Sequence, residues 1–290
     1  MTLTGQCAII TGASQGFGFA IAKQFILAGA DVMLCARDSE LLYRAQQTLI
    51  ATTQTKTRVM AIPTDVSHPQ QMHDLVTKTL DEIGKINILV ANAGIYGVKG
   101  LIEEVDWEEW SQAIDINLKG TVIQCRAVLP HLKKNKCGKI IIISGGGATK
   151  PMPHLSAYAT SKAAIVRFAE TLAEEVRDFY IDVNTVAPGA LNTRFLDEIL
   201  AAGPEKVGNL FYERALKQKQ EGGASLEIGA ALCTFLASAD SNGITGKLIS
   251  ALWDPWLKFP EYLDTLKQSD IYTLRRILPK DRDQPWGDEN

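Results

Sequence analysis

Tyr158 and Lys162 are the two side chains of this sequence whose types and spacing best suit proton-transfer chemistry. Residues four apart on a helix lie on one face, with their Cβ atoms close together. An ammonium group beside a phenol stabilises the phenolate, so we expect the pKa of Tyr158 to fall towards working pH. The pair therefore predicts a phenol that exchanges a proton with a bound molecule.

A glycine-spaced turn near the N-terminus supplies a second candidate site. It covers Thr11–Gly18, after the apolar run Cys7–Ile10 and at the start of a helical pattern. Glycines at such a turn let the chain bend tightly and bring its backbone close to a pyrophosphate, which the helix N-terminus attracts. The glycines are Gly12, Gly16 and Gly18. A dinucleotide site together with a reactive phenol indicates hydride-transfer chemistry.

The end of the second expected strand bears on the choice of dinucleotide. A fold that prefers NAD usually has Asp or Glu there for the ribose 2′-hydroxyl, whereas arginine suits a 2′-phosphate. The chain reads Ala36-Arg37-Asp38 at this point. Because a guanidinium forms forked hydrogen bonds to phosphate, Arg37 favours NADP. NAD is the alternative if Arg37 is only a surface side chain beside Asp38.

Short apolar runs alternate with longer amphipathic stretches along the chain. This alternation predicts βαβ units with right-handed crossovers, and hence an α/β fold with a single doubly wound parallel sheet, Rossmann-like, and helices on both faces. The apolar run 140–143 has no polar alternation, as expected for a central strand covered on both sides. Expected strands are 7–11, 31–35, 58–63, 86–91, 139–144, 182–187 and 247–250, and expected helices lie near 17–28, 39–53, 68–83, 107–134, 157–179 and 225–238.

The order and spacing of the motifs resemble the short-chain dehydrogenase/reductase family, of the Tyr-x3-Lys type, over residues 4–250. The matching motifs are Thr11–Gly18, Asp65-Val66, Asn92-Ala93-Gly94, Asn117 in Asn-Leu-Lys-Gly, Tyr158-Ala-Thr-Ser-Lys162 and Pro188-Gly189 with Thr193. The resemblance implies an NAD(P)-dependent oxidoreductase that interconverts a carbonyl and an alcohol. It also implies a homodimer or homotetramer, formed through the long helices near 107–134 and 157–179.

The resemblance also implies roles for individual residues. Tyr158 would donate or accept the proton, Lys162 would hold the nicotinamide ribose, and Asn117 would hold a water in a proton path. With Ser144, these are the expected catalytic residues. The expected cofactor-binding residues are Gly12, Ser14, Gly16, Phe17, Gly18, Arg37, Asp65, Val66, Asn92, Ala93, Gly94, Tyr158, Lys162, Pro188, Gly189, Leu191 and Thr193.

One position departs from the family pattern. The family places a serine thirteen residues before the tyrosine, where it helps to polarise the substrate carbonyl, but this chain has Gly145 there. Ser144 comes one residue early, and on a regular strand a one-residue offset turns a side chain to the opposite face. A bulge among the three successive glycines would re-aim it, so we predict Ser144 as the working hydroxyl. Thr149 and Ser156 are substitutes in the same loop, and a weakly active or inactive site is the remaining alternative.

Residues 189–224 and 251–290 fall outside the strand–helix rhythm. We expect residues 1–250 to form the cofactor-binding catalytic domain, with 189–224 as a mobile substrate loop. Residues 251–290 form a C-terminal extension that holds Trp253, Trp256 and Trp286. These tryptophans suit a segment that covers an interface or the substrate cleft, or one that packs on its own domain.

Composition narrows the function classes. The formal net charge is −3 and the basic residues are scattered, which gives no support for nucleic-acid binding. No apolar run reaches about 18 residues, so we expect no membrane span, and the first residues lack the pattern of a secretory signal. The cysteines are widely spaced and the histidines form no ligand cluster, which favours a cytoplasmic protein without a metal.

These observations together predict an NADPH-dependent reductase of a small-molecule carbonyl. An NAD-dependent alcohol dehydrogenase, a sugar-nucleotide-modifying enzyme and a non-catalytic cofactor-binding regulator are the alternatives. A pure binding module needs neither the phenol of Tyr158 nor a proton path through Asn117, which favours an enzyme.

Overall fold

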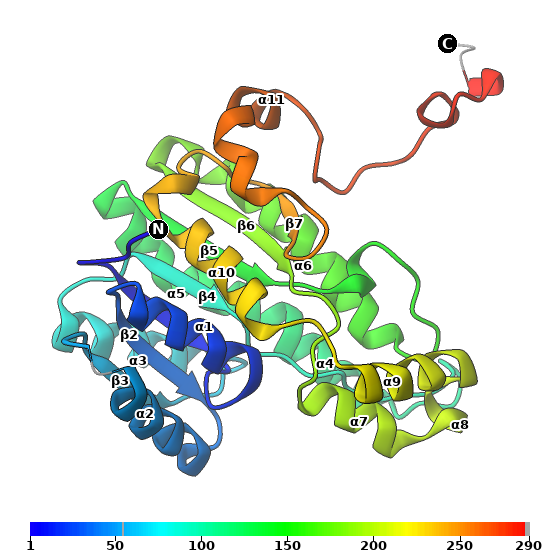
Figure 1. Ribbon diagram of the computed structural model, residues 1–290, viewed down its shortest axis with the longest axis horizontal. Coiled ribbons are helices and arrows are strands. Elements are labelled where there is room, and N and C mark those ends of the chain that lie inside the picture. The colour runs from blue at the N-terminus through cyan, green and yellow to red at the C-terminus, as the bar shows by residue number, and fades with distance from the viewer. Residues whose placement is uncertain (54, 288–290) are drawn as a thin grey trace.

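The computed structural model describes residues 1–53 and 55–287, and its centre is a seven-stranded sheet (Figure 1). All strands are parallel, in the order β3-β2-β1-β4-β5-β6-β7. The strands are β1 (Cys7–Thr11), β2 (Asp31–Ala36), β3 (Val59–Pro63), β4 (Ile88–Ala91), β5 (Gly138–Ile143), β6 (Ile181–Ala187) and β7 (Leu248–Ser250). The order reverses between β1 and β4, and such a switch opens a crevice at the carboxyl ends of the strands. The predicted α/β, doubly wound fold is confirmed.

Helices cover both faces of the sheet and form two separate hydrophobic cores (Figure 1). On one face lie α1 (Gly16–Leu27), α2 (Ser39–Thr53) and α10 (Leu226–Ala237), and on the other lie α3 (Pro69–Ile83), α5 (Gly120–Asn135) and α6 (Ser156–Glu175). Ile141 and Ile143 of β5 point into the first core, whereas Ile140 and Ile142 point into the second. This double burial explains why the strand shows no polar alternation.

The helix predicted over 107–134 is three consecutive segments. These are α4 (Trp107–Ile114), a π-helical turn (Asp115–Lys119) and α5. The carboxylate of Asp106 accepts a hydrogen bond from the backbone N–H of Glu109, which caps the start of α4. Single π-turns inside helices are frequent at functional sites, and this one contains Asn117. The prediction of one regular helix was wrong at this turn.

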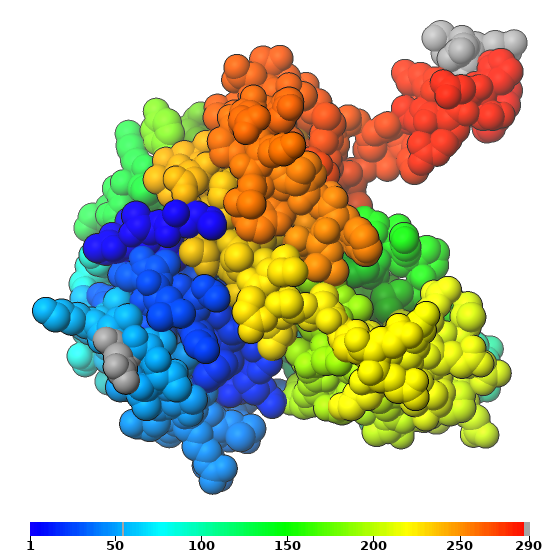
Figure 2. Space-filling model, in the orientation of Figure 1, coloured from blue at the N-terminus to red at the C-terminus, as the bar shows by residue number. Residues whose placement is uncertain are grey.

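Residues 189–224, predicted to be a substrate loop and called by that name below, fold into three short helices at one end of the cleft. They are α7 (Arg194–Ala202), α8 (Pro204–Val207) and α9 (Asn209–Glu221). A single parallel bridge between Leu191 and Ala224 brings the two ends of the loop together. In Figure 2 this segment forms a yellow-green lobe beside the blue N-terminal part of the molecule, with the mouth of the cleft between them.

The C-terminal extension packs partly on the body of the molecule. It contains a 3₁₀ segment (Trp256–Tyr262), α11 (Leu263–Gln268) and short turns at Pro279–Arg282 and Pro285–Gly287. Its last part extends away from the body (Figures 1 and 2). Trp256 is buried beside α10, whereas Trp253 and Trp286 are exposed. Across residues 1–53 and 55–287, every helix is too short or too polar to cross a membrane.

Candidate active site

A cavity of about 1130 Å³ opens at the carboxyl ends of the strands. It is lined by residues from the glycine turn, from the ends of β2, β4, β5 and β6, from α6 and from the substrate loop. Apart from Asn117, every residue that the sequence predicted for the site lines this cavity. The fold therefore brings together motifs that are spread over more than half of the chain.

The glycine turn and the start of α1 form one end of the cavity. Gly12 and Gly16 have left-handed backbone angles, with φ of +63° and +58°, which favour glycine. A Cβ on Gly18 would lie 2.4 Å from the carbonyl oxygen of Gly12, so the turn closes only around glycine. Gln15 precedes α1 and its side chain makes no capping hydrogen bond, which leaves the first N–H groups of the helix for an anion. These features fit the pyrophosphate of a dinucleotide.

Asn92 ties the end of β4 to this turn. Its Nδ2 donates hydrogen bonds to the carbonyl oxygens of Thr11 at 2.9 Å and Gly12 at 3.2 Å. The hydroxyl of Thr11 in turn accepts hydrogen bonds from the backbone N–H groups of Asn92 and Ala93, both at 3.1 Å. These reciprocal bonds hold the two strand ends at a fixed separation under the cavity.

Arg37 lies exposed at the edge of the cavity, directly after β2. The neighbouring carboxylate of Asp38 accepts a hydrogen bond from the backbone N–H of Leu41 at 2.9 Å. Asp38 thereby caps the start of α2, and one of its oxygens is committed to the fold. The guanidinium of Arg37 is the group at this corner that suits a phosphate.

Tyr158 and Lys162 lie on one face of α6 and are almost completely buried, with exposed fractions of 8% and 5%. Lys162 Nζ donates a hydrogen bond to the carbonyl oxygen of Ile143 at 2.8 Å and lies 5.6 Å from the centre of the Tyr158 ring. Burial raises the pKa of the Tyr158 phenol, and the neighbouring Tyr96 raises it further. Burial also lowers the pKa of Lys162 to about 8. The direction is opposite to the predicted lowering for Tyr158, and its main cause is burial of the phenol.

Asn117 lies beneath the cavity and is buried within the π-helical turn. Its side chain accepts a hydrogen bond from the backbone N–H of Ile95 at 2.9 Å and donates one to the Ile95 carbonyl at 2.8 Å. It also donates to Ser161 Oγ at 3.0 Å. The amide thus fixes the backbone that follows β4, and its role in a proton path stays a prediction.

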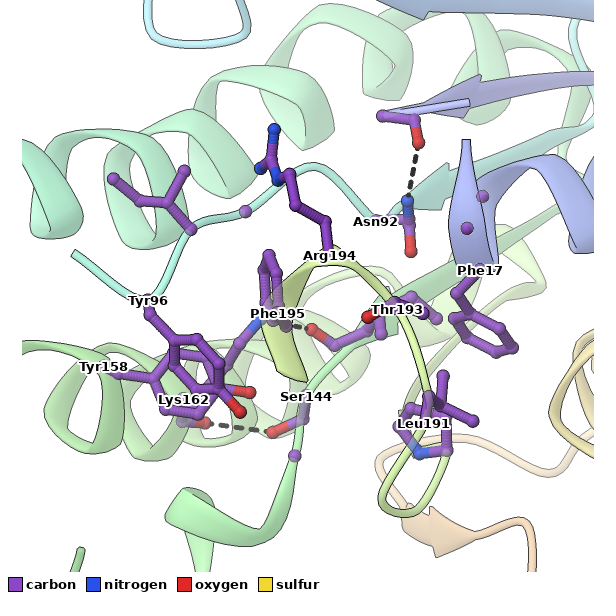
Figure 3. A pocket seen from close by; sticks show the side chains of 18 of the residues that line it. Phe17, Asn92, Tyr96, Ser144, Tyr158, Lys162, Leu191, Thr193, Arg194 and Phe195 are labelled. Carbon is purple, nitrogen blue, oxygen red and sulfur yellow. Dashed lines mark hydrogen bonds between the residues drawn. The ribbon is translucent and has the colours of Figure 1, made fainter. Parts of the chain in front are cut away.

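Ser144 lines the cavity, but its hydroxyl bonds to the protein. Ser144 Oγ donates a hydrogen bond to the backbone carbonyl of Lys162 at 3.2 Å (Figure 3). The predicted bulge is absent at Gly145, whose backbone is fully extended with φ of 177° and ψ of 178°. The chain then turns at Gly146–Ala148, which form a 3₁₀ segment. A Cβ on Gly145 would lie 2.8 Å from Tyr158 Oη, so the family's serine position faces the phenol.

The two alternative hydroxyls lie in different places. Thr149 lines the cavity and is exposed. Ser156 is not among the lining residues, and its Oγ accepts a hydrogen bond from Trp110 Nε1 at 3.1 Å. Of these two, Thr149 is therefore the one that can reach a bound molecule.

The sequence reasoning missed Tyr96, which packs directly against Tyr158. The two ring centres are 4.6 Å apart (Figure 3). The ring centre of Phe195, in the substrate loop, lies 4.7 Å from that of Tyr96. Met152 and Phe211 add further apolar surface to this part of the cavity. Tyr96 follows the end of β4 closely, and that position at the carboxyl edge of a parallel sheet is the signal that would have found it.

The model of the short chain dehydrogenase family matches residues 6–202. The chain is a short-chain dehydrogenase. It is 30% identical over 250 residues to dehydrogenase/reductase SDR family member 4 of Bos taurus. The match covers 85% of this chain and 86% of that protein. It is 35% identical over 250 residues to the 3-oxoacyl-[acyl-carrier-protein] reductase FabG of Chlamydia muridarum, covering 86% and 96% of the two chains.

Structural similarity extends over the same part of the chain. The crystal structure of levodione reductase matches with a TM-score of 0.79 at 25% identity, covering 86% of this chain and 96% of that chain. The protein is therefore an enzyme of the oxidoreductase class, from a family that uses a nicotinamide cofactor. The resemblance drawn from the sequence motifs is confirmed.

Proposed function

We propose that this short-chain dehydrogenase reduces the carbonyl group of a small molecule to an alcohol with NADPH. The observation that carries the proposal is the placement of Tyr158 and Lys162 in the same cavity as the uncapped N-terminus of α1. The pyrophosphate would lie against the glycine turn, and the carbonyl oxygen would lie against the Tyr158 hydroxyl. Two of the three proteins named above, FabG and levodione reductase, are reductases by name, which supports the same reaction class.

The reduced nicotinamide, when bound, supplies a hydride to the carbonyl carbon. Tyr158 gives its proton to the carbonyl oxygen as negative charge develops there, and the oxygen becomes the hydroxyl of the alcohol. Because burial raises the pKa of Tyr158, the phenol keeps its proton until the substrate oxygen demands it. Lys162 lies one turn away and, when protonated, stabilises the phenolate left behind. A phenol that holds its proton tightly suits a donor, which supports the reductive direction.

The Tyr158→Phe variant tests the proton role. Removal of a general acid typically lowers turnover by about 10²-fold to 10⁴-fold. We expect such a loss of NADPH oxidation with acetophenone and cyclohexanone as probes, while NADPH binding measured by fluorescence stays within twofold. Near-normal turnover by Tyr158→Phe would refute the role of the phenol.

Arg37 supports the choice of NADPH, because its guanidinium lies at the cavity edge after β2. Loss of a charge-assisted contact to phosphate costs about 1.5–3 kcal/mol, or roughly tenfold to a hundredfold in affinity. We expect Arg37→Ala to weaken NADPH by that amount and to leave NADH within twofold. Arg44→Ala is the matched control, because Arg44 pairs with Glu40 on α2 and does not line the cavity. Unchanged NADPH affinity in Arg37→Ala would argue for NAD as the cofactor.

We also infer a homodimer or homotetramer that works in the cytoplasm. The cysteines support a reducing compartment, because Cys7, Cys35, Cys125 and Cys233 are buried as free thiols. The faces of α4, α5 and α6 support the assembly by analogy with the family. Light scattering of the purified enzyme measures the subunit number, and a monomer at micromolar concentration would contradict it.

A further inference from the structure

At the end of β5, neither position 144 nor position 145 supplies a hydrogen-bond donor that could act beside Tyr158 on a substrate carbonyl oxygen. Position 145, which faces the phenol, is glycine. A serine hydroxyl has a single proton to donate, and Ser144 gives it to the carbonyl of Lys162. In this arrangement Ser144 has only lone pairs left, and lone pairs do not bond to a carbonyl oxygen. Apart from Thr149 farther along the same loop, a second donor must therefore come from another element.

Tyr96 brings a second phenol into the cavity beside that of Tyr158. Its ring centre lies 4.6 Å from that of Tyr158 at an interplanar angle of 57°. In Figure 3 the two rings overlap, and both hydroxyl groups lie on the side that faces Ser144. Both side chains line the cavity, and no described residue forms a hydrogen bond with either hydroxyl. The proton of Tyr96 is thus available to a bound molecule.

The backbone that carries Tyr96 is held in place. Asn117 forms two hydrogen bonds to the peptide groups of Ile95, the residue immediately before it, at 2.9 and 2.8 Å. Phe195 packs on the Tyr96 ring at 4.7 Å, and the ammonium of Lys99 lies 5.8 Å from the ring centre. A donor fixed before the substrate arrives needs no reorganisation during the reaction, which makes it effective for a developing oxyanion.

Tyr96 also stays protonated at working pH. Burial, and then the negative charge of Glu198, raise the pKa of its phenol to about 12. A neutral phenol is an O–H donor, and its apolar surroundings strengthen the hydrogen bond that it gives. Tyr96 therefore has the protonation state that a donor requires.

We propose that Tyr96 is the second hydrogen-bond donor to the substrate carbonyl, in place of the serine that position 145 lacks. This inference rests on the proposed carbonyl reduction. Tyr158 loses its O–H proton to the carbonyl oxygen, whereas Tyr96 keeps its own proton and only stabilises the charge. The surrounding rings and Met152 then favour a ketone or aldehyde with an apolar, ring-sized substituent.

Steady-state reduction of acetophenone with NADPH tests the donor role. Removal of one oxyanion donor typically lowers kcat by about 10²-fold to 10³-fold. We expect Tyr96→Phe to show a loss of this size in kcat, with KM changed less than threefold. Tyr212→Phe is the matched control, because Tyr212 packs in the same aromatic cluster without lining the cavity. It should keep kcat within twofold, and both variants should keep the melting temperature of the wild type.

Ligand binding gives a readout that does not depend on turnover. The enzyme saturated with its oxidised nucleotide cannot reduce acetophenone, so its affinity can be compared with that of ethylbenzene, which has a similar shape and no carbonyl. We expect Tyr96→Phe to weaken acetophenone at least fivefold and to leave ethylbenzene within twofold. Equal losses for the two probes would show that Tyr96 only packs against the substrate, and would overturn the proposal.

The Ser144 hydroxyl, the competing candidate for the second donor, is tested in the same assay. We expect Ser144→Ala to lose less acetophenone turnover than Tyr96→Phe does, because the Ser144 proton is already committed to the carbonyl of Lys162. A larger loss in Ser144→Ala than in Tyr96→Phe would overturn the proposal in favour of Ser144. If the wild type binds acetophenone through its carbonyl yet oxidises no NADPH, the carbonyl-reductase function fails while Tyr96 stands. If Tyr96→Phe reduces acetophenone as the wild type does, Tyr96 fails while the reductase function stands.

Discussion

A phenol and an amine are buried one helical turn apart in this enzyme, and burial shifts the pKa of each in the direction that favours its neutral form. Burial disfavours the phenolate of Tyr158 and the ammonium of Lys162 alike. Sequence spacing predicts an attraction between the two groups, but it carries no information on how deeply they are buried. The structure therefore reverses the expected direction for the phenol. A donor that keeps its proton and a lysine that titrates near pH 8 are the consequence.

The lowered pKa of Lys162 predicts a pH dependence of stability. The pKa falls from its ordinary 10.5 to about 8, so between these values the unfolded chain binds a proton that the folded protein does not. The free energy of unfolding of the wild type should therefore rise across this window. In Lys162→Met this contribution is lost. We expect the stability difference to move in favour of the wild type by about 3 kcal/mol between pH 8 and 10.5.

Chemical unfolding of both proteins without added nucleotide, at several pH values from 7 to 10.5, measures this difference. Other titrating groups are common to both proteins and cancel in the comparison. Parallel stability curves across the window would show that Lys162 stays charged in the folded state.

Gly145 predicts a steric effect on the phenol. An added Cβ would lie 2.8 Å from Tyr158 Oη, and the ring of Tyr96 limits how far the phenol can yield. A displacement of about 1 Å at a reacting group can cost about 10²-fold in rate. We expect Gly145→Ala to lower kcat at least tenfold with a melting temperature within about 2 °C, since extended backbone accepts alanine. Gly146→Ala is the control, because its Cβ would meet no atom within 4 Å, and full activity in Gly145→Ala would contradict the argument.

Individual motif residues could be predicted because the family's spacing places each of them at the end of a particular strand or on a particular helix. The glycine turn, Asn92 and the Tyr158–Lys162 pair all come to one cavity as the spacing indicates. Tyr96 and the direction of the Ser144 hydroxyl could not be predicted, because each depends on which groups lie across the cavity. Those contacts come from elements far apart in the chain.

At the scale of elements, apolar periodicity predicted the strands and most helices. The predicted strands begin or end within two residues of those observed, as with β4, which starts at Ile88 instead of residue 86. The π-helical turn at Asp115–Lys119 could not be predicted, since helical periodicity continues through it. Within this turn the amide of Asn117 bonds to Ile95 and Ser161 on neighbouring elements, and periodicity carries no information on such contacts.

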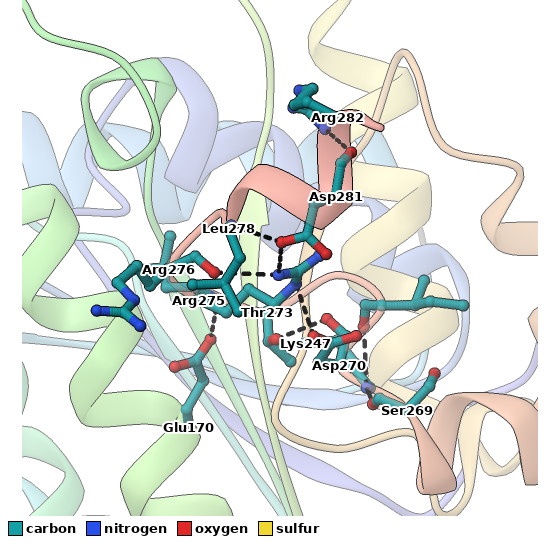
Figure 4. A network of polar contacts seen from close by, with 12 residues as sticks. Glu170, Lys247, Ser269, Asp270, Thr273, Arg275, Arg276, Leu278, Asp281 and Arg282 are labelled. Carbon is teal, nitrogen blue, oxygen red and sulfur yellow. Dashed lines mark hydrogen bonds and ion pairs between the residues drawn. The ribbon is translucent and has the colours of Figure 1, made fainter. Parts of the chain in front are cut away.

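The C-terminal extension is held by a buried lysine at the end of the sheet (Figure 4). Lys247 Nζ donates hydrogen bonds to the carbonyl oxygens of Ser269 at 3.0 Å and Ile271 at 2.9 Å. Glu170 of α6 accepts a further bond from the backbone N–H of Leu274 at 2.6 Å. These contacts position the segment after α11, together with the Tyr272 ring, which packs 5.0 Å from that of Phe259.

Lys247→Met should therefore loosen this segment and leave the active site intact. Loss of hydrogen bonds to a charged group costs about 1.5–3 kcal/mol. We expect a fall of this order in the free energy of unfolding, faster proteolysis within residues 268–275, and nucleotide affinity within twofold. Lys258→Met is the control, because Lys258 is an exposed lysine of the same extension. Proteolysis at the wild-type rate in Lys247→Met would show that other contacts hold the segment.

At the scale of the whole molecule, the extension divides into two parts with different relations to the core. Trp256, Phe259 and Leu266 belong to the hydrophobic core on the α1 and α10 side, and the Trp256 ring lies 5.6 Å from that of Phe235. Beyond Leu274 the chain contributes mainly exposed side chains, such as Ile277 and Trp286. The sequence left open whether the tryptophans pack on their own domain. Trp256 does so, whereas Trp253 and Trp286 are exposed.

This division predicts two different outcomes of truncation. A chain that ends at Ser250 loses the buried side chains of Ala251, Trp256, Phe259 and Leu266 and exposes Phe235. Each of the three large side chains contributes about 1.5–3 kcal/mol when it is buried in the core. The sum is comparable to the total stability of many proteins, so we expect this form to be largely unfolded or insoluble. A chain that ends at Leu274 keeps those side chains and loses ion pairs of exposed residues such as Arg275 and Asp270. Such pairs contribute little, so its melting temperature should stay within about 2 °C.

Circular dichroism melts of the two truncated forms measure this difference directly, with the full chain as reference. Light scattering of the same samples reports whether residues beyond Leu274 hold subunits together. If the form ending at Leu274 melts as the full chain but changes its subunit number, the exposed side chains of the last segment act in assembly and not in folding. A stable, soluble form ending at Ser250 would show instead that the core closes without Trp256.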